Sequence, residues 1–273
     1  MSQGRSEASA RKRLLAHWDE VTPGADLAQA AGAVAVSVRR IQLAPGEHVE
    51  LPQRRTEDVL FVVAGGTDGL RADDCVVYPV PHEAPTLRAG DDGLTALLFA
   101  TPADPPPFHS GDPEPPRTVN LADADSAYEG EAGRWVLLAR QAGAQHAGVN
   151  YGRLESGHDG APPHCHSADE ELFVFLEGAA SIELWPSPLA VLENQKEKET
   201  VEVRAGHVLS RPPSTGVSHS LRASDQGASF LVYGTRRPND VCYYPRSNKI
   251  YWRGLGLIAR LEPLAYDDGE PED

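Results

Sequence analysis

One short β-strand pattern occurs twice in the chain, once in each half. Residues 59–65 (VLFVVAG) match residues 172–178 (LFVFLEG) at an offset of 113 positions, and residues 87–89 (LRA) match residues 221–223 (LRA) at an offset of 134. Short apolar runs that end at glycine are typical of β-strands. The repeat therefore predicts two similar β-domains. The second copy has roughly 20 additional residues, the difference between the offsets, and we expect a longer hairpin or surface loop at residues 186–199.

Further short runs rich in Val, Leu and Phe, separated by Gly, Pro and Asp, continue the pattern. They lie at residues 34–41, 59–63 and 94–99 in the first half, and at 135–138, 149–154, 172–176, 181–185, 200–203, 207–210 and 230–233 in the second. Strands this short and this closely spaced favour an antiparallel barrel or sandwich. The fold class predicted is all-β.

The domain organisation follows from where the strand pattern is interrupted. Residues 1–104 are predicted to be the N-terminal barrel, with residues 1–32 as an arm and one short helix at residues 10–19. Residues 105–117 are rich in proline, which a sheet interior excludes, so they are predicted to be a linker. Residues 118–273 then form the C-terminal barrel with its extension.

The charge of the chain limits its partners. With 25 Lys and Arg against 40 Asp and Glu, the net charge is −15. Such a surface repels nucleic-acid phosphates and anionic lipids, so we expect no nucleic acid and no membrane partner. The first residues lack the apolar core of a signal peptide, and three widely separated cysteines argue against a disulfide framework. The predicted location is cytoplasmic.

Residues 164–171 (HCHSADEE) read as half of a metal site. Side chains alternate along a strand, so His164 and His166 share one face. The chain then reverses, and the strand that begins at Leu172 returns the Glu171 carboxylate to the two imidazoles. A fourth ligand is expected from residues 206–219.

These segments resemble the two motifs of the cupin superfamily, and the chain is similar to uncharacterised two-barrel cupins (bicupins). In this sequence the motif positions are His158 (with Gly157 beside it), His164, His166, Glu171 and Gly178, followed by Gly206, Pro212, Gly216 and His219. The departures from the motifs are that small shift, a longer turn at residues 212–216, and Ala223 where Asn often stands. None removes a ligand. The resemblance implies two double-stranded β-helix (jelly-roll) barrels, with a metal held by His164, His166, Glu171 and His219. It also implies a possible homodimer.

The first copy of the repeat lacks this ligand set. At the same offsets, its four ligand positions hold Leu51, Gln53, Asp58 and Pro85. Leu and Pro have no side-chain donor for a metal. His48 and His82 lie nearby, but neither has a position that replaces a ligand. We therefore predict a degenerate N-terminal barrel without metal and one metal ion per chain, in the C-terminal barrel.

Three imidazoles and one carboxylate suit a divalent transition metal: Fe, Mn, Ni, Zn or Cu. Such a centre keeps a net positive charge and attracts a small anionic or oxygen-rich ligand. The prediction is a metal-dependent enzyme. With Fe(II) it would be dioxygenase-like, and with Zn or Mn it would carry out isomerisation, hydrolysis or decarboxylation. The alternative is a non-catalytic cupin that binds a metal or small ligand in a structural or sensing role.

Residues near the motifs are candidates for the substrate pocket. Phe173 and Phe175 share strand parity with Glu171 and should line the barrel interior. Tyr151 and Arg153 lie on the preceding strand. Of these, Arg153 is the candidate for pairing with a substrate carboxylate, because a guanidinium inside a barrel requires an anion.

Other residues have simpler readings. Glu170 is the alternative ligand to Glu171 but is expected to face outward, and Cys165 is expected to be a small buried side chain. His158 and His207 are expected in loops or at the surface, with proton transfer as the alternative role. Residues 234–253, aromatic and basic, are expected to pack on the barrel or across the interface rather than to bind nucleic acid.

Overall fold

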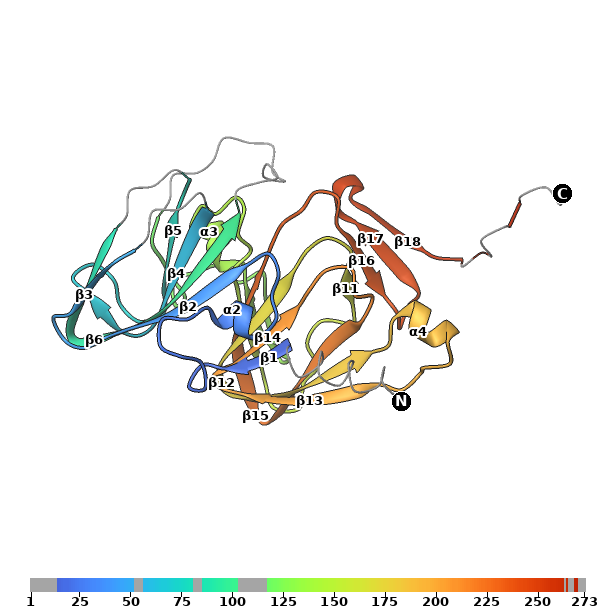
Figure 1. The fold of residues 1–273 in the computed structure, drawn as a ribbon, viewed down its shortest axis with the longest axis horizontal. Helices are drawn as coiled ribbons and strands as arrows, with labels where there is room; N and C mark the ends of the chain where they lie inside the picture. The colour runs from blue at the N-terminus through green and yellow to red at the C-terminus, as the bar shows by residue number, and fades with distance from the viewer. Residues whose placement is uncertain are drawn as a thin grey trace.

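The computed structural model describes residues 14–51, 56–80, 85–102, 117–262, 264 and 268–269. Figure 1 shows two groups of strands side by side, which form the N-terminal and C-terminal barrels. The predicted all-β fold of two jelly-roll barrels is confirmed. No helix among these residues is long and apolar enough to cross a membrane.

The N-terminal barrel is a six-stranded antiparallel sheet in the order β2-β6-β4-β5-β7, with β3 also paired to β6. Its strands are β2 (Ser37–Leu43), β3 (His48–Glu50), β4 (Thr56–Thr67), β5 (Asp74–Tyr78), β6 (Thr86–Pro102) and β7 (Val119–Asn120). One short helix, α2 (Leu27–Ala30), precedes them; the Asp26 side chain caps it by accepting hydrogen bonds from the N–H groups of Ala28 and Gln29.

The C-terminal barrel is an eight-stranded sheet in the order β1-β14-β12-β15-β10-β9-β8, with β13 paired to β12. Its strands are β1 (Leu15–His17), β8 (Tyr128–Gly130), β9 (Gly133–Val136), β10 (Asn150–Leu154), β12 (Glu171–Trp185), β13 (Glu199–Arg204), β14 (His207–Arg211) and β15 (Ser218–Gly234). Two short helices, α3 (Leu138–Gln141) and α4 (Pro188–Leu192), belong to this half.

A separate four-stranded sheet has the order β11-β16-β17-β18. It joins β11 (Cys165–His166) to β16 (Val241–Tyr244), β17 (Lys249–Trp252) and β18 (Leu257–Arg260), with the 3-10 helix η2 (Arg253–Leu255) between the last two strands. The aromatic and basic extension thus packs on the barrel, as predicted, because it pairs with the strand that holds His166.

The strand registers confirm the internal repeat. Asp58 pairs with Ala100 between β4 and β6, and Glu171 pairs with Gly234 between β12 and β15, at the offsets of 113 and 134. The two long strands also carry register shifts at equivalent places. Gly178 shows why glycine ends each motif: its φ is +67°, and a Cβ there would lie 2.1 Å from the carbonyl oxygen of Gly227.

Some sequence-based expectations are wrong in detail. Of the predicted helix at residues 10–19, residues 10–13 lie outside the described part; Leu14 is in a 3-10 turn, and Leu15–His17 is the strand β1, which pairs with β14. Leu15 packs against the C-terminal core, so tertiary contacts override local helix propensity. The longer hairpin expected at residues 186–199 is confirmed, because this segment joins the paired strands β12 and β13, but it also contains the helix α4, which was not predicted. Most of the predicted linker, residues 103–116, lies outside the described residues, and the domain boundaries stay a prediction.

The outer faces of the two barrels pack into one shared apolar core. It includes Phe61 and Phe99 from the N-terminal barrel and Leu172, Leu231 and Tyr233 from the C-terminal barrel. Each barrel also has its own interior cluster. The joint core fixes one barrel against the other.

A reciprocal pair of buried carboxylates strengthens this interface. Glu170 accepts hydrogen bonds from the N–H groups of residues 34–36, at 2.7–3.1 Å. Glu57, its equivalent in the first copy, accepts from the N–H groups of residues 145–147, at 2.6–2.8 Å. Each barrel therefore holds the backbone just before a strand of the other.

Candidate metal centre

The four predicted ligands come together at one point of the C-terminal barrel. His164 and His219 exchange backbone hydrogen bonds across an isolated β-bridge, His166 lies on β11 and Glu171 begins β12. The Nε2 atoms of His164, His166 and His219 lie 3.6, 3.5 and 3.1 Å from Oε2 of Glu171. Three imidazole nitrogens thus converge on one carboxylate oxygen.

The polarity of this cluster indicates that a cation belongs between its members. Nε2 of His166, Nε2 of His219 and Oε2 of Glu171 are buried without a well-aligned hydrogen bond. Leaving such groups unpaired is costly, whereas a divalent ion would satisfy all of them at once. The donor set of three nitrogens and one oxygen therefore fits a transition metal.

The pKa shifts reflect the same crowding. Burial lowers the pKa of His219 to about 3, so this imidazole is neutral and its nitrogen is available to a metal. Burial alone would raise the pKa of Glu171, but the three histidines lower it, and the carboxylate stays ionised. Burial alone would lower the pKa of His166, but the carboxylates of Glu171 and Asp240 raise it. A proton and a metal ion therefore compete for this site.

Asp240 is a site residue that sequence reasoning missed. Its Oδ2 lies 2.7 Å from Nδ1 of His166, and its Oδ1 accepts hydrogen bonds from the N–H groups of Ala168 and Asp169. This contact orients the His166 ring so that Nε2 faces Glu171. The only sequence signal was an acidic residue within the basic extension.

The other two imidazoles are also positioned by neighbours. Nδ1 of His164 lies 2.8 Å from the carbonyl oxygen of Pro162, which favours a proton on Nδ1 and leaves Nε2 free. The ring of Tyr244, on β16, stacks on the His164 ring at a centroid distance of 5.7 Å. Phe173 contacts the His219 ring edge to face at 5.3 Å. The extension and the barrel thus hold the cluster from opposite sides.

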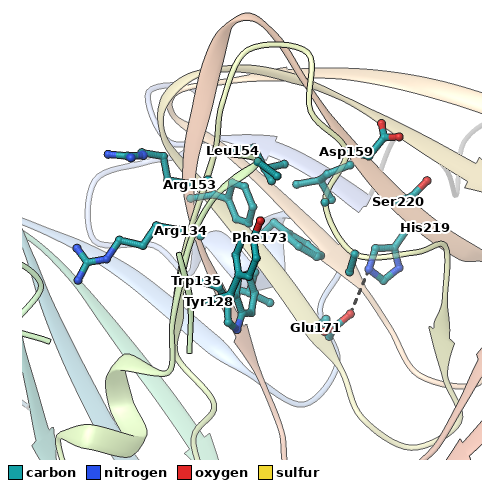
Figure 2. Close-up of a pocket in the computed structure, with 18 of the residues that line it drawn as sticks. Tyr128, Arg134, Trp135, Arg153, Leu154, Asp159, Glu171, Phe173, His219 and Ser220 are labelled. Carbon is teal, nitrogen blue, oxygen red and sulfur yellow. Dashed lines mark ion pairs between the residues drawn. The ribbon is translucent and has the colours of Figure 1, made fainter. Parts of the chain in front are cut away.

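A cavity of about 490 Å³ opens beside the cluster. It is bounded by the ligands His164, Glu171 and His219, by the apolar side chains of Trp135, Leu154, Phe173, Leu221, Phe230 and Val232, and by Tyr128, Arg134, Asp159 and Ser220, among others. Figure 2 shows the Arg134 and Arg153 side chains extending away from His219 and Glu171. The face nearest the ligands is therefore largely apolar.

The predicted pocket residues have mixed outcomes. Phe173 lines the cavity, whereas Phe175 is buried deeper in the barrel, against Phe230. The interior position on β10 belongs to Gly152, where a Cβ would lie 2.6 Å from the Phe230 ring. By strand alternation Tyr151 and Arg153 face away from the Gly152 side, so the predicted interior orientation of Arg153 is wrong, although Arg153 is among the residues that line the cavity, as predicted.

Arg153 and Tyr151 instead have partners outside the barrel interior. The Arg153 guanidinium lies at the rim and pairs with Glu155 at 3.0 Å, and both side chains are about half exposed. Tyr151 packs against the core shared by the two barrels. Neither side chain contacts the ligand cluster.

The neighbouring candidates also have structural explanations. Glu170 points out of the C-terminal barrel, as predicted, but it is buried against residues 34–36 rather than exposed to solvent. Cys165 is buried, as predicted, and all three cysteines are free thiols. His158 and His207 are half-buried and do not line the cavity. Among the described residues, every group of potential metal ligands lies in the C-terminal half.

Comparisons with known proteins extend the fold assignment. No protein-family model and no curated protein sequence matches the chain. Solved structures do match: an oxalate decarboxylase formate complex from Lactobacillus farciminis has a TM-score of 0.60 at 17% identity, covering 82% of this chain and 86% of that one. Another oxalate decarboxylase structure has a TM-score of 0.62 at 14% identity, covering 84% and 78%.

A third match is a structure of Bacillus subtilis oxalate decarboxylase, described in terms of its Mn(II) centres, with a TM-score of 0.61 at 13% identity. It covers 84% of this chain and 78% of that chain. At these identities the likeness concerns the fold alone. The chain has the two-barrel fold of these oxalate decarboxylase structures, and its candidate metal centre lies in the second barrel.

Proposed function

We propose that the C-terminal barrel binds one divalent transition metal ion through His164, His166, Glu171 and His219. The observation that supports this most directly is the convergence of three Nε2 atoms on one carboxylate oxygen, buried and without aligned hydrogen bonds. Four protein ligands leave positions open on an ion that prefers six. Those positions face the cavity, because three of the four ligands line it.

We further propose a metal-dependent enzyme whose substrate is a small molecule with an oxygen donor at one end and an apolar body. The donor, such as a carboxylate or enolate, would bind at the centre. The body would pack against Trp135, Phe173 and Phe230, which line the cavity. For a second anionic group on the substrate, the cationic lining residues are Arg134 and Arg153, and Arg153 already pairs with Glu155 at 3.0 Å. Arg134 donates to Ser126 and to the carbonyl oxygen of Ala124, outside the cavity.

The lining also bears on the type of reaction. Isomerisation of a sugar-like substrate requires a proton-transfer side chain close to the reacting atoms. Among the described lining residues, Asp159 is largely exposed and paired with Arg222 at 2.8 Å, and Figure 2 shows its carboxylate pointing away from Glu171. A dioxygenase-like reaction depends less on such a residue, since a redox-active ion supplies the chemistry with dioxygen. The cavity therefore favours the dioxygenase-like alternative, with Trp135, Phe173 and Phe230 orienting the substrate and excluding water.

The second candidate is a binding protein without turnover. It is favoured by the largely apolar lining beside the ligands, to which Trp135, Phe173 and Phe230 contribute. Manganese belongs among the candidate metals with Fe, Ni, Zn and Cu, and the Mn(II) centres of Bacillus subtilis oxalate decarboxylase, a protein of this fold, support its inclusion.

The proposal also includes a cytoplasmic location, a possible homodimer, and the absence of nucleic-acid and membrane partners.

Metal analysis of protein purified without added metals tests the centre. We expect about one ion per chain, and loss of most of it in His166→Ala and His219→Ala. His158→Ala is the matched control, because this histidine lies on the same barrel outside the ligand set. Unchanged metal in His219→Ala, or two ions per chain, would contradict the assignment.

Oxygen uptake by the Fe(II)-loaded protein, screened with small aromatic and aliphatic carboxylates, then separates the two functions. Substrate-dependent uptake that is lost in His219→Ala supports the enzyme. If ligands bind but no oxygen is consumed, and the ligands stay chemically unchanged with each of the five metals, the protein is a binding protein without turnover.

A further inference from the structure

Arg211, the last residue of β14, is a buried cation that the proposed reaction does not use. It is 5% exposed and pairs in register with Glu171 on β12. Its Nη2 donates to the carbonyl oxygen of Val217 at 2.7 Å, whereas its Nε is buried without a partner. Among the described residues, no carboxylate forms an ion pair with it. Burial lowers the pKa of Arg211 only to about 10, so the guanidinium stays charged at neutral pH.

An uncompensated buried guanidinium is unfavourable unless an anion accepts its hydrogen bonds. The nearby groups do not provide one. Burial raises the pKa of the Cys165 thiol, so it is neutral. Glu171, in register with Arg211, is the nearest anion and raises its pKa, but no hydrogen bond joins the two described side chains, and Oε2 of Glu171 lies within 3.6 Å of three imidazole nitrogens. The buried Nε–H of Arg211 therefore has no acceptor among the described residues.

A second cavity, of about 560 Å³, has Arg211 among its lining residues. It lies between α4 and the turn before β15, and its lining includes Trp185, Ser187, Ala190 and Thr215. It shares no described lining residue with the cavity beside the metal ligands. The two cavities are separate compartments of one barrel.

Polar groups in the second cavity suit an oxygen-bearing ligand. The Ser187 hydroxyl accepts a hydrogen bond from the N–H of Ala190, and the Thr215 hydroxyl accepts one from the N–H of Val217. A hydroxyl that accepts still has its own hydrogen to donate. Lys196, Glu197 and Glu199 also line the cavity, so its lining, with Arg211, is balanced rather than strongly basic.

We propose that this second cavity binds a small ligand with a single negative charge, a monocarboxylate or similar oxyanion, whose oxygens accept hydrogen bonds from Arg211. The acidic groups in the lining disfavour ligands with several charges. Within the described parts of the first barrel, this site has no equivalent. In the first copy Tyr78 takes the place of Arg211 against Asp58, and α4 lies in the segment that only the second copy has.

Titration of the full chain with sodium acetate at constant ionic strength tests the site. Trp185 lines the cavity with Lys198 over its ring at 3.5 Å, so its fluorescence should change on binding. We expect a saturable change in the wild type that Trp185→Phe removes. Affinity should fall at least about tenfold in Arg211→Met, the loss expected for a charge-assisted hydrogen bond. Arg204→Met, an exposed arginine on β13, is the matched control and should bind like the wild type.

Two further measurements keep the outcome decisive. The acetate response should persist after metal is removed with a chelator, because the ligand contacts Arg211 and not the metal centre. Ala190→Phe, which fills the cavity from the surface helix α4, should abolish binding even if Arg211→Met fails to fold. The proposal is overturned by a wild type without a saturable response, by equal affinity in folded Arg211→Met, or by full affinity in Ala190→Phe.

Discussion

Asp240→Asn is the substitution that most sharply tests how the metal centre is held. The Asp240 side chain is 1% exposed and touches no predicted ligand except His166. Burial alone would raise its pKa, but the hydrogen bond from His166 leads the groups that lower it from 3.8 to about 2. Each pKa unit corresponds to about 1.4 kcal/mol, so the ionised carboxylate contributes about 2 kcal/mol to the free energy of unfolding.

The sign of the pH dependence follows from the lowered pKa. Because the folded state holds Asp240 ionised more strongly than the unfolded state does, this stability is fully present above about pH 4. It is lost as the pH falls through about 2. In Asp240→Asn the contribution disappears at neutral pH. Chemical denaturation at pH 7 should therefore show a loss of about 2 kcal/mol, and the difference from the wild type should shrink in acid.

The same substitution should weaken metal binding without removing a ligand. An amide in place of the carboxylate no longer fixes the His166 ring with a charged acceptor, and loss of such an outer contact typically costs about 10–100-fold in metal affinity. Competition with a fluorescent chelator measures this. Asp225→Asn, an exposed residue of β15, makes the same change in charge and is the control. If the two variants bind metal equally well, Asp240 does not position the centre.

Three further predictions concern the ligands and the fold. Glu170→Gln should lower the free energy of unfolding by about 2–3 kcal/mol, since three backbone N–H groups lose a charged acceptor, but this variant should keep its metal. Glu171→Gln should lose its metal. If Glu170→Gln lost metal and Glu171→Gln kept it, Glu170 would be the ligand. Chelation should lower the melting temperature reversibly; re-addition at about 100 times Kd should restore about 3 kcal/mol, and an unchanged melting temperature would refute a stabilising ion. Gly178→Ala should cost at least about 2 kcal/mol in chemical denaturation, because its φ is +67° and the new Cβ would meet Gly227; a neutral effect would contradict the tight turn.

Local spacing predicted the repeat and the convergence of the four candidate ligand side chains. The apolar runs at residues 59–65 and 172–178 each occupy a central strand, and their offset reappears in the pairing of Asp58 and Glu171. Strand alternation also separated Glu171, which faces the histidines, from Glu170, which does not. These features depend on positions close together in sequence, where alternation and turn length fix the geometry.

Features that depend on distant segments were not predictable. Asp240 reaches His166 only because β16 pairs with β11, a contact between residues 74 positions apart. The orientation of Arg153 was wrong because the interior place on β10 is set by the Phe230 ring, which leaves room only for Gly152. The buried Arg211 carries no motif at all, since its isolation depends on which side chains surround it after folding.

The N-terminal barrel influences a site to which it gives no ligand. Glu170 and Glu171 are consecutive, so the side chain of one fixes the direction of the other across the strand. Residues 34–36 hold both oxygens of Glu170, and the Thr235 hydroxyl accepts a hydrogen bond from its N–H at 3.1 Å. The start of β12 is thereby anchored on the face opposite the histidines. A substitution that loosens the interface between the barrels, such as Glu170→Gln, should therefore leave the metal ion bound but lower its affinity, although the residue lies outside the ligand cluster.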